Sequence, residues 1–116
     1  MANIRRTSAL CKTGNWGDYR FLKDQLLRAT SSVAANIAEG HSRESLGDSA
    51  RFLMIAKASA AECSHHLEEA ALLGIISRAE ADEVIGEHEQ VERMLRGLVT
   101  SRSRYLGPNN AGPNAD

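Results

Sequence analysis

The segment ECSHHLEE, residues 62–69, carries side-chain types that could bind a metal ion. Glu62 and His65 have the Glu-x-x-His spacing that places both side chains on one face of a helix, as in helical bundles that hold iron or manganese. A two-metal centre needs a second such pair, and the later acidic segment, residues 87–92, does not supply one. We therefore expect a solvent-facing polar surface with one partly buried histidine, and a metal-binding bundle is the less favoured alternative.

Other patterns of catalytic chemistry are missing from the sequence. Cys63 and His65 are two positions apart, which points them to different faces of a helix. The stretch SSVAANIAEGHSRES, residues 31–45, has one glycine and lacks the G-x-x-x-x-G-K-[ST] pattern of a phosphate-binding loop. The sequence therefore supplies no catalytic mechanism and no cofactor site, and we expect a non-enzymatic protein.

The composition indicates one modest domain. The chain has 116 residues, a formal net charge of -1 and 42% hydrophobic residues, while aromatic residues make up 4%. An interior built from aliphatic side chains favours packed helices over a sheet. Cys11 and Cys63 have no CxxC spacing, no secretory leader precedes them, and no apolar run reaches the roughly 20 residues of a membrane-spanning helix. We expect a cytoplasmic protein that does not enter a membrane.

Apolar residues at spacings of three and four predict four helices. We expect a short helix over residues 2–12, a second over 19–39, a third from about 45 to 73, and a fourth from about 78 to 106. The residues predicted to face inward are Ile4, Ala9, Leu10 and Cys11 in the first helix, Phe52, Leu53, Ile55 and Ala56 in the third, and Val84, His88, Val91, Leu95 and Leu98 in the fourth.

Local signals mark the ends of these helices. Asp18 is a good N-cap for the second helix, and Gly40 and Gly74 can take the left-handed conformation that ends a helix. Ser77 and Glu80 have the spacing of a capping box at the start of the last helix. We therefore predict an all-α, up-and-down four-helix bundle with a short first helix. Residues 1–106 form one domain, and residues 107–116 form a disordered tail.

Charge is divided unevenly along the chain. Residues 61–92 contain one basic and nine acidic side chains, whereas residues 93–106 contain four basic and no acidic ones. In an up-and-down bundle the two chain ends and the corner at residues 40–45 share one end, which would then be basic and could contact RNA phosphates. The arginines predicted to gather there, or within about two helical turns of it, are Arg5, Arg6, Arg43, Arg96, Arg102 and Arg104.

Residues 22–98 resemble a known family. The run LKDQLLRATSSVAANIAEGHSRES, followed by RFLMIAKASAAE, is similar to the four-helix-bundle family first met in intervening sequences of bacterial 23S ribosomal RNA genes. The family's Asn-Ile-Ala-Glu-Gly core corresponds to residues 36–40. The resemblance implies a homopentameric ring without known enzymatic activity. Its motif residues at the corner, to which we assign a structural role, are Asn36, Glu39, Gly40, Arg43 and Arg51, with Glu39 pairing with Arg43 or Arg51.

A related branch of this family is the accessory variability protein of diversity-generating retroelements, a basic pentameric barrel that binds nucleic acid and a reverse transcriptase. This chain departs from the family in its short first helix, in Ala34 where a proline is common, and in Ala58 where a glycine is frequent. Its net charge of -1 also differs from the basic character of that branch. The nucleic-acid function of the branch therefore does not transfer directly.

The residues and the resemblance together support two functional hypotheses. The first is a non-enzymatic, homo-oligomeric helical scaffold that binds RNA or a ribonucleoprotein through its basic end. The alternative is a protein-protein adaptor without a nucleic-acid role, in which the acidic face of one subunit meets the basic face of another. Trp16, beside the turn after the first helix, is expected to pack in the core or between subunits.

Overall fold

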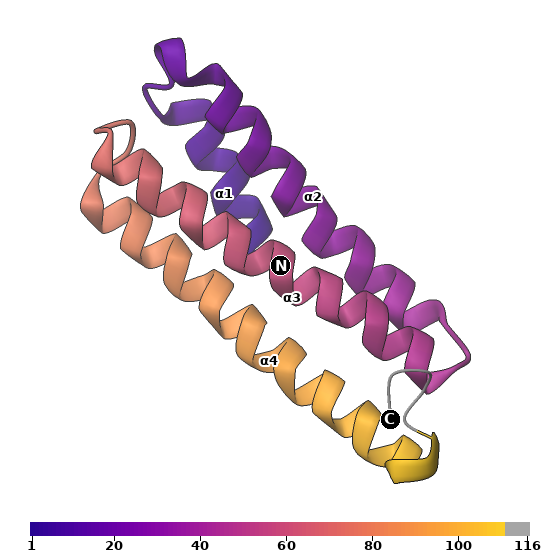
Figure 1. Cartoon of the computed structure of the whole chain (residues 1–116). Coiled ribbons are helices and arrows are strands. Elements are labelled where there is room, and N and C mark those ends of the chain that lie inside the picture. The colour runs from indigo at the N-terminus through magenta and orange to yellow at the C-terminus, as the bar shows by residue number, and fades with distance from the viewer. Residues whose placement is uncertain (111–116) are drawn as a thin grey trace.

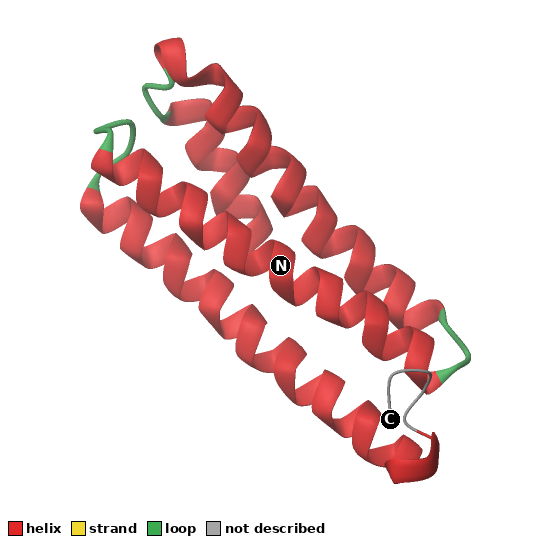
Figure 2. Ribbon diagram, viewed as in Figure 1, coloured by secondary structure: helices red, strands yellow, loops and turns green. Residues whose placement is uncertain are grey.

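The computed structural model describes residues 1–110, with side chains described for residues 1–103. Four helices run up and down and form an elongated bundle of 51 × 24 × 20 Å (Figure 1). Figure 2 shows that helices and short loops account for the described residues, without a strand. The elements are α1 (Ala2–Thr13), a 3-10 turn (Gly17–Tyr19), α2 (Arg20–Ser42), α3 (Leu46–Leu72) and α4 (Arg78–Asn110). The predicted all-α bundle is confirmed.

Helix α1 covers only part of the bundle. Its 12 residues span about 18 Å, whereas the 27 residues of α3 span about 40 Å. Helix α1 packs against α2 and α4, opposite α3, and its N-terminus lies midway along the bundle (Figure 1). The half of the molecule near the α2–α3 connection is therefore built from three helices.

The core follows this division into two halves. In the four-helix half, side chains from all helices form one cluster, and in the three-helix half Leu53, Ala56 and Leu95 form a second. Half-buried Ile37 and Val91 pack against both clusters. The largest fully buried apolar side chains are Leu22, Leu26, Val33, Leu53, Cys63, Leu67 and Leu95. Among the described residues, no helix is long and apolar enough to cross a bilayer.

Side chains cap the starts of α3 and α4, and the capping box of α4 is the one that the sequence predicts. The Ser45 hydroxyl accepts a hydrogen bond from the Asp48 amide at 3.2 Å at the start of α3. At the start of α4, the Glu80 amide donates to the Ser77 hydroxyl at 3.0 Å. The Ser77 amide in turn donates to the Glu80 carboxylate at 2.9 Å, which completes the capping box.

Gly74 ends α3 in the predicted left-handed conformation, with φ of 76°. The Gly74 amide donates to the Ala71 carbonyl, and the Ile75 amide donates to the Ala70 carbonyl. This pair of bonds is the Schellman motif, which satisfies carbonyl groups that the helix leaves without partners. The short α3–α4 connection follows from it.

The prediction that Gly40 ends the second helix is wrong. Helix α2 continues to Ser42, and the glycines with positive φ among the described residues are Gly17 and Gly74. Gly40 instead lies inside α2 and is buried where this helix packs against α3. A Cβ atom at this position would lie 2.8 Å from Cδ2 of Leu53, closer than packed carbon atoms can approach. Gly40 therefore permits the close contact between the two helices.

Two further predictions about helix ends need correction. Asp18 lies inside the 3-10 turn, and the residue at the N-cap of α2 is Tyr19, which makes no capping bond with its side chain. Helix α4 continues beyond Leu106 to Asn110, past the end that the sequence predicts. The rest of the predicted tail, residues 111–116, lies outside the described residues.

The inner face of α1 is more polar than predicted. Asn3, Thr7 and Leu10 are buried at spacings of four and three, whereas Ala9 is exposed. Trp16 is 4% exposed, and its indole Nε1 donates to the Leu10 carbonyl at 3.0 Å. Trp16 therefore anchors the end of α1 in the core, which is one of the two positions expected for it.

Candidate functional site

The family-motif residue Asn36 joins α2 to α3 through a serine pair. The Asn36 side-chain amide donates to the Ser32 carbonyl at 2.8 Å and to the Ser32 hydroxyl at 3.1 Å. The Ser32 hydroxyl lies 2.7 Å from the hydroxyl of Ser59 on α3. These hydroxyl groups bond to each other across the helix pair, so Asn36 and Ser32 link α2 to α3.

The corner between α2 and α3 holds two arginines around one aromatic ring. Arg43 pairs with Glu39 at 2.8 Å, and Arg51 pairs with Asp48 at 3.3 Å. The two guanidinium carbons lie 4.6 and 5.0 Å from the centroid of the Phe52 ring. Of the two expected partners of Glu39, Arg43 is the one observed. Both arginines are thus engaged by a carboxylate and a ring within the protein.

Arg5 and Arg6 do not join this corner. Because α1 is short, its N-terminus reaches only the middle of the bundle, so the predicted gathering of all six arginines is wrong (Figure 1). Arg6 pairs with Glu83 on α4, and its Nε lies 3.5 Å from the Glu87 carboxylate. Arg6 therefore fastens α1 to the acidic half of α4.

The remaining predicted arginines lie on α4. The Arg102 Nε donates to the buried Ser49 hydroxyl at 2.6 Å, so Arg102 lies beside the start of α3, near the corner. Arg96 is exposed and has no ion pair within the described part of the chain. The side chain of Arg104 lies outside the described residues. The structure thus brings Arg43, Arg51 and Arg102 to the end of the bundle that holds the α2–α3 connection. Arg96 lies earlier on α4, further from this end.

A buried polar network lies between α1 and α4. His88 is fully buried, with its Nε2 2.8 Å from the Thr7 hydroxyl and its Nδ1 3.4 Å from the Asn3 side-chain amide. The Thr7 hydroxyl donates its single hydrogen to the Asn3 carbonyl at 2.5 Å. Its oxygen can therefore only accept from His88, which assigns the proton of the neutral ring to Nε2. Nδ1 then accepts from Asn3.

Burial lowers the pKa of His88 from 6.5 to about 4. At neutral pH the ring is therefore uncharged and both of its nitrogens have partners. A proton added to Nδ1 would face the Asn3 amide, which is also a donor in this arrangement. His88 thus fastens α1 to α4 and does not act as a free base.

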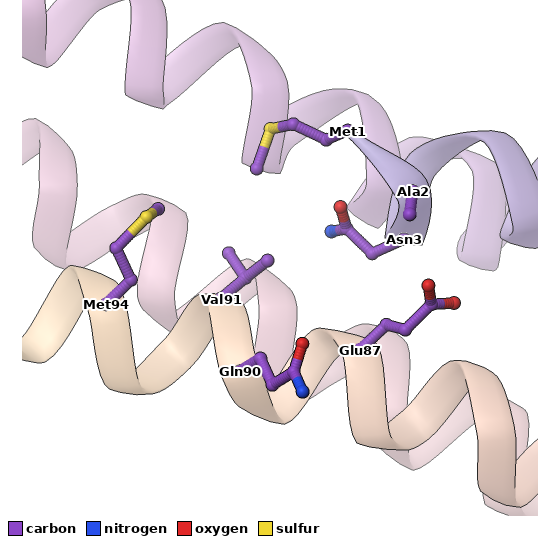
Figure 3. Close-up of a pocket in the computed structure, with 7 residues that line it drawn as sticks. All are labelled: Met1, Ala2, Asn3, Glu87, Gln90, Val91 and Met94. Carbon is purple, nitrogen blue, oxygen red and sulfur yellow. The ribbon is translucent and has the colours of Figure 1, made fainter.

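A hollow of about 290 Å³ opens between the N-terminus of α1 and α4 (Figure 3). Met1, Val91 and Met94 form its apolar part, while Asn3 and Glu87 lie close together at its other end. The hollow is smaller than most sites for drug-sized ligands. The hollow marks the position along α4 at which α1 begins.

The Glu-x-x-His pattern does not bring its two side chains together. Glu62 lies 3.3 Å from Nε2 of His66, while His65 is exposed. Within the described residues, no group of three or more His, Cys, Asp or Glu side chains could hold a metal ion. The partly buried histidine that the sequence predicts on this segment is His66, which is 8% exposed.

Cys11 and Cys63 are free and buried. Burial raises the pKa of each thiol to about 11, and the hydrogen bond that Cys63 makes with Thr30 opposes this only in part. A thiol with so high a pKa is a poor nucleophile. The cysteines therefore act as small core residues.

The outward face of α3 exposes apolar side chains. Helix α3 packs against α2 and α4, and its exposed residues recur at spacings of three and four, so they lie on one side. Met54 is 57% exposed, Ile55 42% and Leu72 76%, so the prediction that Ile55 faces inward is wrong. We call this face the α3 ridge, and its residues are Arg51, Met54, Ile55, Ala58, Ala61, Glu62, His65, Glu69 and Leu72.

The fold and these contacts define an all-α four-helix bundle with architectural polar networks and an uncovered outer helix face. A family model described as "23S rRNA-intervening sequence protein" matches residues 8–97. The chain therefore belongs to this family, which confirms the resemblance predicted from residues 22–98. The relation to the accessory variability protein stays a prediction.

A solved structure has the same fold. It is a crystal structure, at 1.70 Å resolution, of a protein of unknown function from the S23 ribosomal protein family of Bacteroides thetaiotaomicron. The TM-score is 0.74 and the sequence identity 23%, over 83% of this chain and 90% of that chain. The comparison with curated proteins gives no match.

Sequence reasoning missed two features of the site. Asn3 and Thr7 share a helical stripe with Leu10, but their polarity hid their inward position. The α3 ridge was missed for the opposite reason, because apolar Ile55 was predicted to face inward on a helix with a broad apolar face. The signal available for Asn3 and Thr7 was their spacing from Leu10.

Proposed function

We propose that the protein is a non-enzymatic helical scaffold that associates with copies of itself through the α3 ridge. The observation that carries the proposal is the exposure of Met54, Ile55 and Leu72 on one outward face of α3. Met54 and Ile55 are adjacent on this face, and exposed apolar patches mark interaction surfaces on otherwise polar proteins. The number of copies that the family resemblance implies is five.

The chemistry of the buried titratable groups supports a non-enzymatic role. His88 is kept neutral by burial, which lowers its pKa, and is bonded to Asn3 and Thr7. Cys11 and Cys63 are buried thiols with raised pKa values. Each is committed to packing or to a hydrogen bond inside the bundle. Two free cysteines also favour the reducing environment of the cytosol.

The experiment that tests self-association uses one substitution on the ridge and one elsewhere. Ile55→Glu places a charge in the apolar face, and Gln25→Glu adds the same charge on the exposed side of α2. We expect light scattering to give a mass several times the 12.6 kDa of one chain for the wild type and for Gln25→Glu. Ile55→Glu should give a smaller mass while circular dichroism shows a folded helix. A wild-type monomer at all concentrations would overturn the proposal.

Contact with RNA is the second candidate function. It is favoured by exposed Arg5 and Arg96, which have no ion pair within the described residues, and by the family's description as a 23S rRNA-intervening sequence protein. Arg43 and Arg102 already bond to groups of the protein, which leaves fewer free donors at the corner than the sequence suggests.

The RNA proposal is tested by binding of a structured RNA at several salt concentrations. If Arg5 and Arg96 each contact a phosphate, replacing either by Gln should remove about one released counterion. The slope of log K against log salt concentration should then become less steep by about 1. Arg78→Gln is the control, because Arg78 pairs with Glu68 at the acidic end. Binding that is absent at low salt, or equal effects of all three substitutions, would contradict RNA contact through these arginines.

A further inference from the structure

A second exposed apolar surface lies on the side of the bundle opposite the α3 ridge. Helix α1 packs on this side against α2 and α4 but begins only midway along the bundle (Figure 1). In the three-helix half, the side chains that pack over the Leu53 cluster from this side are only partly buried. We call this surface the open face, and its residues are Ala34, Ile37 and His41 on α2 and Val91, Met94 and Leu98 on α4.

Helix spacing places these six residues on one side. Lys23 of α2 lies close enough to the Cys11 thiol of α1 for its charge to act on it. Steps of three and four residues lead from Lys23 to the α2 residues of the open face. On α4, Glu87 faces Arg6 of α1, and the same steps lead from Glu87 to the α4 residues. Figure 3 shows Met94 on this side of α4.

The ridge and the open face carry their large apolar side chains at the same height along the bundle. The hydrogen bond between Arg102 and Ser49 shows that these residues of the antiparallel α4 and α3 are level. Six residues further along α3 is Ile55, and the position six residues back along α4 lies midway between Met94 and Leu98. Two copies side by side at equal height therefore bring apolar surface against apolar surface.

The charges that the ridge presents to a partner are acidic. Arg51 is held within its own chain by a carboxylate and the Phe52 ring. Glu62 and Glu69 each direct one oxygen toward His66, and their side chains remain 56% and 47% exposed. A contact between two ridges would bring like charges together, so the ridge is better matched to a basic surface than to a second ridge.

The open face is bordered by a basic side chain. Arg93 is exposed, lies next to Met94 and has no ion pair within the described residues. By the same count from the Arg102–Ser49 bond, Arg93 is level with Ala58. Glu62 of a neighbouring copy at equal height then lies one helical turn from Arg93, within reach of the long arginine side chain.

We infer that the α3 ridge of one copy packs on the open face of a second copy of this chain, in the place beside α2 and α4 that α1 leaves free. The inference rests on the proposed self-association and adds to it the surface that receives the ridge. The α3 helices of the two copies then run in the same direction, because the reversed direction would carry Glu62 about 16 Å from Arg93.

A contact between two different surfaces has a consequence for the assembly. Each copy offers its ridge to one neighbour and its open face to another, on opposite sides of the bundle (Figure 1). Such a head-to-tail contact closes into a ring when the rotation between neighbours closes. It allows an odd number of copies, including the five that the family resemblance implies.

Two variants, each with one damaged surface, test the inference. Ile55→Glu damages the ridge, and Met94→Glu damages the open face, where Met94 is 49% exposed. We expect light scattering to give a monomer for each variant alone at concentrations at which the wild type assembles. A 1:1 mixture should form a dimer of twice the 12.6 kDa of one chain, because the intact ridge of one variant meets the intact open face of the other. Gln25→Glu is the control and should assemble like the wild type.

The other outcomes separate the inference from the proposed function. If Met94→Glu assembles like the wild type, or if the mixture stays monomeric, the inference fails while self-association through the ridge stands. A monomeric wild type rejects both. If circular dichroism shows that Met94→Glu is unfolded, Ala34→Glu on the α2 side of the open face takes its place, since Ala34 is exposed, and the same results are expected.

Cysteine cross-linking tests the same contact without adding a charge. Ala58 of the ridge and Met94 of the open face differ in height by about 1.5 Å, and a disulfide requires Cα atoms within about 7 Å. Background from the native thiols is low, because Cys11 and Cys63 are buried. We expect a mixture of the Ala58→Cys and Met94→Cys proteins to form cross-linked dimers, and neither protein to do so alone. Dimers from Ala58→Cys alone would indicate contact between two ridges and overturn the inference.

Discussion

Acid should destabilise the bundle through His88. The pKa of this buried imidazole is about 4 in the folded protein and 6.5 in an exposed chain. Between these values the unfolded state binds a proton that the folded state does not, so stability falls as the pH is lowered. Above pH 6.5 the imidazole is neutral in both the folded and the unfolded state, so the stability that depends on it is fully present. It is lost progressively as the pH falls from 6.5 to about 4.

The size of the effect follows from the same two values. Each pH unit within this interval corresponds to about 1.4 kcal/mol, so the interval from 6.5 to about 4 corresponds to about 3 kcal/mol. Carboxylates also titrate near the lower limit. A variant that lacks only the imidazole therefore isolates the contribution of His88.

Urea unfolding from pH 7.5 to pH 4, at one protein concentration, measures this contribution. His88→Gln removes the titrating group and keeps a side chain that can donate to Thr7. We expect the difference in unfolding free energy between wild type and His88→Gln to shrink as the pH falls. The control, His65→Gln, replaces an exposed histidine and should follow the wild type. Parallel curves for the wild type and His88→Gln would refute the buried neutral network.

Three further predictions concern packing, capping and the thiols. Gly40→Ala should lower the free energy of unfolding by about 1–3 kcal/mol, because its Cβ would lie 2.8 Å from a side chain of α3. The control Gly86→Ala meets no atom within 4 Å and should stabilise the helix by up to about 1 kcal/mol, so equal effects in urea titrations would contradict the close contact. Ser77→Ala removes the hydroxyl that caps α4 and should cost about 1 kcal/mol, measured by thermal unfolding, where an unchanged Tm would contradict the capping role. Because burial raises the pKa of Cys11 and Cys63 to about 11, a thiol reagent at pH 8 should label them at least about 100-fold more slowly in the native protein than in urea, and rapid native labelling would disprove their burial.

Local signals account for what the sequence predicted well. The Ser77 capping box and the left-handed Gly74 depend on residues within one turn, so their patterns can be recognised without the fold. Gly40 was misread because a helix end and a close helix contact both require the absence of a Cβ atom. Only the position of Leu53 on the neighbouring helix distinguishes them.

The candidate site depends on relations that a single sequence does not contain. Arg6 pairs with Glu83 because α1 begins midway along the bundle. Sequence spacing alone does not show where along the bundle α1 lies. Likewise, the apolar side chains of Met54 and Ile55 look the same in the sequence whether they face a core or a partner. Their exposure on the folded chain is what points to association.

The mass of the native wild-type protein in solution tests the central proposal most directly. Native mass spectrometry over a hundredfold range of protein concentration would count the copies in the assembly without any substitution. The proposed scaffold predicts a species containing several 12.6 kDa chains, and the number that the family resemblance implies is five. A monomer at every concentration would contradict self-association.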